Sequence, residues 1–153
     1  MDLRRLRPAE WVLGTAALVL VVALFLPWFT VGPSAGGPTY SAWHALSVVD
    51  ILLFACAAMG LLAVVVQATQ RSQALPVITS VFATWAGLLA VALVVAKLID
   101  HPELGGLPDA VVAIRWGIWL GLGAAIGIVA GGWWAVADDR PGRVPAPHLE
   151  SSG

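Results

Sequence analysis

Residues 51–70 read ILLFACAAMGLLAVVVQATQ, a run of twenty residues without a charged side chain. Three further stretches share this property: Trp11–Phe29, Ser72–Ala96 less its flanking polar residues, and Trp116–Ala137. A hydrocarbon core about 30 Å thick is crossed by roughly 20 helical residues, and a helix satisfies its backbone polar groups within its own segment. The four stretches therefore predict four transmembrane helices, at about 9–29, 42–70, 75–99 and 110–137.

The composition agrees with a membrane protein. Hydrophobic residues make up 59% of the 153 residues and charged residues 11%, and the mean hydropathy is +0.89; soluble domains carry about 25% charged residues. A net charge of −1 provides no basic field for nucleic acid. We expect one membrane domain over residues 1–148 and read residues 149–153, LESSG, as an added linker.

The connections predict an all-α, up-down four-helix bundle. Glycine and proline between residues 30 and 40, a short polar link at 70–73 and a proline and glycine run at 100–108 indicate loops. Basic residues mark the cytoplasmic side of a membrane protein, and they are unevenly divided between the two sides. One side receives only Lys97 and Arg115, and the other receives Arg4, Arg5, Arg7, Arg71, Arg140 and Arg143. Both termini are therefore expected in the cytoplasm.

The chain carries no pattern typical of an enzyme. Cys56 is the only cysteine, so there is no disulfide framework, CxxC pair or thiolate metal cluster. This excludes the four-helix thiol oxidoreductases of membranes. We find no Ser/His pair, paired carboxylates or His cluster with a catalytic spacing. The sequence therefore predicts no catalytic residues, no cofactor and no metal.

Charged residues at the outer ends of the predicted helices form a candidate polar cluster. Asp50 lies about two turns into the second predicted helix, Lys97 near the end of the third, and Arg115 at the opening of the fourth. A carboxylate at that depth is costly unless it is paired or hydrated. The three side chains can form an ion pair that fixes the order of the helices, or a polar vestibule for an ion, a proton or a small anion.

The last predicted helix contains glycines at four-residue spacings, which place them on shared helix faces. Glycine lets a neighbouring backbone approach closely, and close packing holds helices together in lipid. Packing inside one molecule and a seam between two molecules are both consistent with the pattern. The candidate packing glycines are Gly117, Gly121, Gly123, Gly127 and Gly131.

Several motifs resemble a family of small, uncharacterised four-helix membrane proteins of actinobacteria and related high-GC bacteria. The motifs are LPWF at 26–29, SAWHALSVVD at 41–50, QATQRS at 67–72 followed by LP at 75–76, and GGWW at 131–134 before DDRP at 138–141. The resemblance covers nearly the whole chain and implies a multi-pass protein of a bacterial cytoplasmic membrane. It implies no activity and no functional residues.

The sequence as a whole predicts a non-enzymatic protein that lies in the lipid bilayer. Its leading functional hypothesis is an accessory or assembly subunit, with a second copy of the chain or a larger membrane protein as partner. The alternative is a small ion- or proton-coupled transporter or channel that uses the polar cluster around Asp50.

Overall fold

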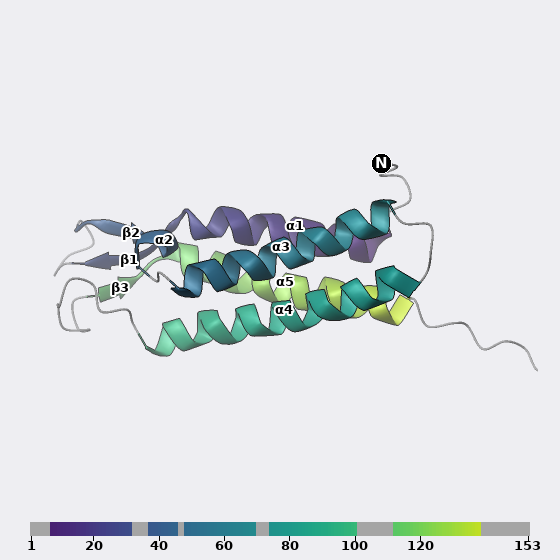
Figure 1. Cartoon of the computed structure of the whole chain (residues 1–153). Helices are drawn as coiled ribbons and strands as arrows, with labels where there is room; N and C mark the ends of the chain where they lie inside the picture. Colours follow the sequence, from purple (N-terminus) through teal and green to yellow (C-terminus); the bar gives the residue numbers. More distant parts are fainter. Residues whose placement is uncertain (1–6, 32–36, 46–47, 70–73, 101–111, 139–153) are drawn as a thin grey trace, which may run out of the picture.

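The computed structural model describes residues 7–31, 37–45, 48–69, 74–100 and 112–138. Four long helices lie side by side, and a small β-sheet lies at one end of them (Figure 1). The long helices are α1 (Pro8–Leu24), α3 (Val48–Thr69), α4 (Ala74–Ile99) and α5 (Trp116–Asp138). The first residue of α1 and the last of α5 lie at the end away from the sheet.

Three of these helices are long and apolar enough to cross a membrane. They span Val48–Thr69, Ile78–Ile99 and Trp116–Asp138, whereas the apolar helix α1 has 17 residues. Helix α1 ends at Leu24, five residues before the predicted end. The restricted backbone of a residue that precedes proline disfavours helix at Leu26, and the aromatic and β-branched residues after Pro27 favour a strand.

The fold is mostly helical, as expected, but three short strands that were not predicted form an antiparallel sheet at one end of the helices. The strands are β1 (Pro27–Val31), β2 (Thr39–Ser41) and β3 (Val112–Ile114), and their order is β2-β1-β3. Phe29 pairs with Tyr40 on one side and with Ile114 on the other. Segments expected to be a loop and the start of the last helix are therefore strands.

Two helix starts also differ from the expectation. The segment predicted as one helix over 42–70 contains the four-residue helix α2 (Ala42–Ala45) and then α3, with residues 46–47 outside the described part. Helix α5 begins at Trp116, since Val112–Ile114 pair with β1. The basic residues 4, 5, 71, 140 and 143 and the linker at 149–153 lie outside the described residues.

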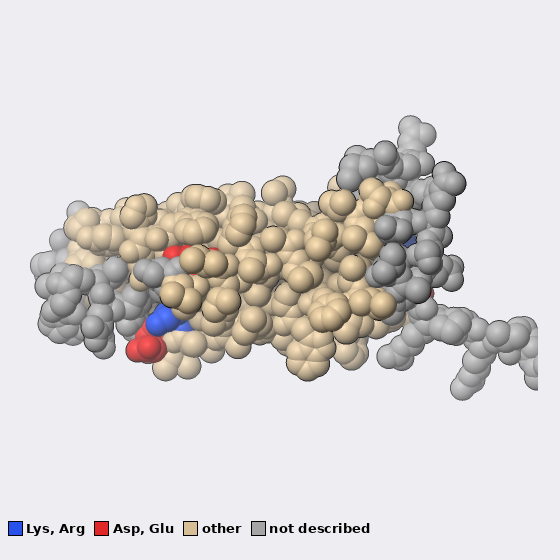
Figure 2. Space-filling model, in the orientation of Figure 1, with Lys and Arg blue, Asp and Glu red and all other residues tan. Residues whose placement is uncertain are grey.

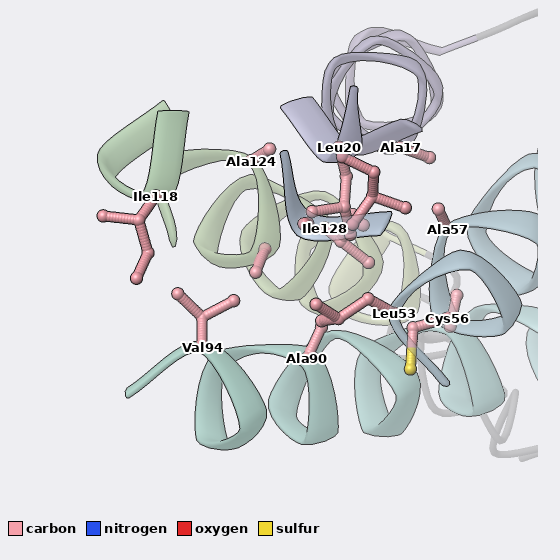
Figure 3. Packing of buried hydrophobic residues seen from close by; sticks show 14 of the residues in the cluster. Ala17, Leu20, Leu53, Cys56, Ala57, Ala90, Val94, Ile118, Ala124 and Ile128 are labelled. Carbon is pink, nitrogen blue, oxygen red and sulfur yellow. The ribbon is translucent and has the colours of Figure 1, made fainter. Parts of the chain in front are cut away.

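The core lies between the four long helices and extends under the sheet. In Figure 3, Leu20 of α1, Leu53 of α3, Val94 of α4 and Ile128 of α5 extend into the space that the helices enclose. All four side chains are fully buried. The alanines at 17, 57, 83, 90 and 125 are also fully buried. Because their side chains are small, the helices pack closely at these positions.

Four of the five candidate glycines of α5 lie against another element. A Cβ at Gly131 would lie 2.6 Å from the backbone nitrogen of Leu13, and one at Gly127 would lie 2.8 Å from the Cβ of Ala16. Gly117 and Gly121 lie against β1. A Cβ at Gly123, in contrast, would meet nothing within 4 Å. The glycine pattern therefore serves packing inside the molecule at four positions, and Gly123 faces outward.

These contacts predict opposite effects for one substitution at two positions of the same helix. Gly131→Ala places a methyl group against the backbone of α1, and overpacking of this kind costs about 1–3 kcal/mol. Gly123→Ala has the same gain in helix propensity without the clash, so it is the matched control. Unfolding in mixed detergent micelles should show Gly131→Ala to be less stable than Gly123→Ala by about that amount. Equal stabilities would contradict the packing described here.

Candidate functional site

Charged side chains lie close to the two ends of the helical bundle. On the face shown in Figure 2 they occupy positions near each end, and uncharged residues cover the long middle. The three residues of the candidate polar cluster belong to the end that carries the sheet. They lie at the start of α3, near the end of α4 and immediately before α5.

Asp50 is fully buried, and so are both oxygens of its carboxylate. It lies in the first turn of α3, not two turns into a helix as the sequence suggested. The free N–H groups and the dipole at a helix N-terminus favour a negative charge within the first turn. Its position in α3 thus offsets part of the cost of burying this carboxylate.

Lys97 forms an ion pair with Asp100, which follows the last residue of its own helix, α4. Its Nζ lies 3.6 Å from an Oδ of Asp100, three residues along the chain, and the Asp100 side chain is largely exposed. The pair suggested from sequence, between Lys97 and Asp50, is not the one that Lys97 makes. An exposed ion pair of this type contributes little stability, so it is not a main determinant of the fold.

Arg115 connects the sheet to the start of α5. Its backbone N–H donates to the carbonyl oxygen of Trp28 at 2.8 Å, and its Nε donates to the hydroxyl of Thr30 at 2.6 Å. Thr30 is buried in β1. Both contacts go to the central strand, so Arg115 fixes the strand-to-helix junction. The three predicted residues therefore share one end of the molecule, and the contacts described for Lys97 and Arg115 are with Asp100 and with β1.

Trp28 is the buried aromatic residue at this end. A register shift between Pro27 and Phe29 in the pairing of β1 with β2 places Trp28 at an irregularity of the strand, and such bulges redirect side chains. Its Nε1 donates to the carbonyl oxygen of Ala23 in the last turn of α1 at 2.7 Å. A Cβ at Gly117 or Gly121 would lie 2.8 Å from atoms of its ring. The ring fills the space above the two glycines.

A second polar group lies in the half of the bundle away from the sheet. The Nε2 of Gln67 in α3 donates to the Ser80 hydroxyl in α4 at 2.6 Å, and the Thr84 hydroxyl donates to the Ser80 carbonyl at 2.8 Å. A Cβ at Gly132 would lie 2.5 Å from the Thr84 hydroxyl. These contacts join α3, α4 and α5. Sequence analysis missed this group, although polar residues in apolar helices were a signal for it.

The described residues contain no group of three or more His, Cys, Asp or Glu side chains arranged to hold a metal ion. His44, exposed in α2, shares a hydrogen bond with the Ser41 hydroxyl at 3.0 Å. Cys56 is buried in α3.

An open groove of about 520 Å³ runs along the outer surface between α1 and α5. Its lining is almost entirely apolar and includes two tryptophans, three larger aliphatic residues and several small residues. The α1 side contributes Trp11, Val12, Thr15, Ala16 and Val19, and the α5 side contributes Trp119, Leu120, Gly123 and Ala124. The outward-facing glycine of α5 therefore belongs to this groove.

The described residues form a mostly helical fold with three long apolar helices, a shorter apolar helix and a three-stranded sheet at one end, and large apolar side chains are exposed along the helices. No protein-family model, no curated protein sequence and no solved structure matches the chain.

The Trp28 hydrogen bond predicts different effects for two tryptophan substitutions. Trp28→Phe removes one of the two donors to the Ala23 carbonyl, which keeps the Leu26 N–H at 3.1 Å, and the loss of a hydrogen bond of this kind costs about 0.5–1.5 kcal/mol. The Nε1 of Trp43 is also buried but has no hydrogen-bond partner within the described residues, so Trp43→Phe is the control. Unfolding in detergent should show a clear loss for Trp28→Phe and a smaller change for Trp43→Phe. The reverse order would contradict the role given to Trp28.

Proposed function

We propose that the chain is a four-pass protein of a bacterial cytoplasmic membrane, with both termini in the cytoplasm. Three helices have the length and hydropathy of membrane spans. The 17 residues of α1 rise about 26 Å, close to the hydrocarbon thickness. Open sheet edges belong outside the hydrocarbon. Because the start of α1 and the end of α5 lie at the opposite end of the helices (Figure 1), cytoplasmic termini put the sheet on the outer side in this proposal.

Within this membrane, the proposed role is that of a non-enzymatic accessory or assembly subunit. The observation that carries this proposal is a stripe of large apolar side chains on α4. Ile78, Phe82, Trp85 and Leu89 repeat at helical spacing, and each is about half exposed or more, with Trp85 at 67%. Aromatic side chains belong to membrane–water interfaces, whereas Trp85 lies near the middle of α4. A protein neighbour in the membrane supplies such a ring with a close-packed surface.

The subunit proposal predicts a particle larger than one chain. Extraction in a mild detergent should yield the 15.9 kDa chain together with further copies or another membrane protein. Trp85→Ala should reduce the associated protein severalfold. Trp133→Ala, at a residue 65% exposed near the far end of α5, is the matched control and should have little effect. Recovery of a bare monomer from the wild type would contradict the proposal.

The burial of Asp50 favours one alternative, a small ion- or proton-coupled transporter or channel. A buried carboxylate in a membrane protein is a common feature of proton and ion pathways. In this alternative, Asp50 binds and releases the proton or ion, and the neighbouring end of the bundle opens to the outer side.

The alternative predicts flux through purified protein in liposomes. Asp50→Asn keeps the size of the side chain and removes its charge, so it should abolish a flux that depends on the carboxylate. Asp138→Asn makes the same change at an exposed carboxylate at the end of α5 away from the sheet and should leave the flux in place. An absence of flux for the wild type under proton and sodium gradients would remove the alternative.

A further inference from the structure

The packing of α1 against α5 fixes which positions of the two helices lie at the same height in the bundle. A Cβ at Gly131 would lie 2.6 Å from the backbone nitrogen of Leu13, and one at Gly127 would lie 2.8 Å from the Cβ of Ala16. The numbering rises along one helix as it falls along the other, so the two helices are antiparallel. Extended along both helices, this register places residue 11 level with residue 133 and residue 25 level with residue 119.

Aromatic side chains occupy both of these heights. Trp11, Phe25, Trp119 and Trp133 are each more than half exposed, and the ring of Phe25 also lies 5.8 Å from that of Trp43 between centroids. Tryptophan rings prefer the two membrane–water interfaces. In the proposed orientation, these side chains therefore form two ring levels, an inner one at the start of α1 and an outer one beside the sheet.

The interval between the two ring levels contains no other aromatic residue and no charged residue on either helix. Glu10 lies outside it, and so do the two further tryptophans of α5, Trp116 and Trp134. Both of these tryptophans are also exposed. The apolar side chains of α1 and α5 are thus bounded by aromatic rings at the same two heights.

This interval is shorter than an ordinary hydrocarbon layer. Fourteen residues separate the rings on each helix, a rise of about 21 Å, whereas a typical hydrocarbon core is about 30 Å thick. Elsewhere on the bundle, the apolar span of α4 covers Ile78–Ile99 and rises about 32 Å. Tilting the whole bundle leaves this difference between the helices unchanged. A short apolar interval is accommodated when the bilayer becomes thinner beside it.

We propose that the exposed surface of α1 and α5 between the two ring levels, here called the short side, is solvated preferentially by phospholipids with short acyl chains. The inference rests on the proposed placement of the helices in the membrane. Large aliphatic residues belong to this side, among them Leu18, Val22 and Ile126, which are 52–56% exposed. Short chains fill a height of about 21 Å directly, whereas longer chains must tilt or bend there to keep their headgroups level with the rings.

A second copy of the chain would also shield a short apolar side from a thicker bilayer. Helices that pack together in lipid meet through small residues, whereas the exposed positions halfway between the ring levels carry Leu18 and Ile126. The rings at both heights suit contact with headgroups, because an indole combines an apolar body with a polar N–H group. Lipid is therefore the occupant that these side chains favour.

The test measures which acyl chain length is preferred beside each helix. The full chain carries Cys56→Ala, which removes its only cysteine, and one new cysteine labelled with the fluorophore NBD, either Leu18→Cys on the short side or Leu88→Cys at an exposed position of α4. Bilayers of dimyristoleoyl, dioleoyl or dierucoyl phosphatidylcholine contain the same small fraction of a nitroxide-labelled dioleoyl lipid as quencher. At Leu18→Cys, the dimyristoleoyl lipid should displace the quencher severalfold better than the dierucoyl lipid. At Leu88→Cys, it should have no advantage.

Tryptophan variants show whether the ring levels set this preference. Trp11→Leu, Trp133→Leu and Trp134→Leu together remove the inner ring level, so the preference at Leu18→Cys should shift toward the dioleoyl lipid. Trp85→Leu changes an exposed tryptophan of α4 and is the matched control, because it should leave the preference at Leu18→Cys unchanged. An unaltered preference in the triple variant would contradict the role given to the rings.

The remaining outcomes distinguish this inference from the proposed function. Equal displacement by all three lipids at Leu18→Cys, or the same short-chain preference at Leu88→Cys, would overturn the inference and leave the membrane placement standing. A label at Leu18→Cys that no lipid quenches, with Leu88→Cys quenched, would assign the short side to a protein contact and overturn the inference as well. No quenching at either position would instead contradict the membrane placement on which both proposals rest. If labelled Leu18→Cys fails to fold, Ile126→Cys at the same height of α5 decides the outcome.

Discussion

The contact of the Trp28 indole with two glycines determines how the bundle closes at its sheet end. The ring lies on Gly117 and Gly121 of α5, while its N–H group binds the carbonyl of Ala23. One side chain thereby completes the last turn of α1 and occupies the face of α5. Because lipid supplies no hydrophobic force between helices, close packing and satisfied hydrogen bonds hold such an arrangement. The remaining features of this end follow from that placement.

Trp28 is fixed between α1 and α5. Because Trp28 belongs to β1, this strand lies against the ends of the two helices. Four consecutive residues of β1, Trp28–Val31, are buried, which a strand achieves only when both of its faces are covered. Its polar groups are satisfied by β2 and β3 and by Arg115, whose Nε reaches the Thr30 hydroxyl. The sheet therefore lets the chain leave the short helix α1 without exposing unpaired backbone groups.

The sequence predicted the long helices well because the absence of charge over about 20 residues is a strong constraint. Helix α4 begins at Ala74, one residue from the expected start, and ends at the expected Ile99. The same criterion cannot separate a helix from a strand, since both can be uncharged. Pro27 and the β-favouring residues 28–31 were the local signal for β1. The pairing with residues 112–114 depends on contacts distant in sequence and could not be read from either segment.

The residues of the candidate site could be identified from the sequence, but the residues that each of them contacts could not. Four-residue spacings identified the glycines of α5, yet Gly121 contacts Trp28 whereas Gly123 faces open space. Two residues along a helix are about 200° of rotation apart, so which face turns inward depends on the neighbouring helices. Lys97 and Arg115 likewise have partners set by where α4 ends and α5 begins. The place of Asp50 in the first turn of α3 was not predicted, because residues 42–49 contain neither proline nor a charged residue and were read as part of one continuous helix.

The packing of the described interior bears on how the protein can act. A pathway between α1 and α5 would require them to separate where Gly131 lies against the Leu13 backbone and Gly127 against Ala16. Such contacts are close because no side chain intervenes, and separating them forfeits dispersion contacts that lipid replaces only in part. Association through the outer surface needs no such opening. The groove at Gly123 and the stripe around Trp85 already lie on the exterior, which is consistent with the proposed role of a protein that acts through what binds to its outer surface.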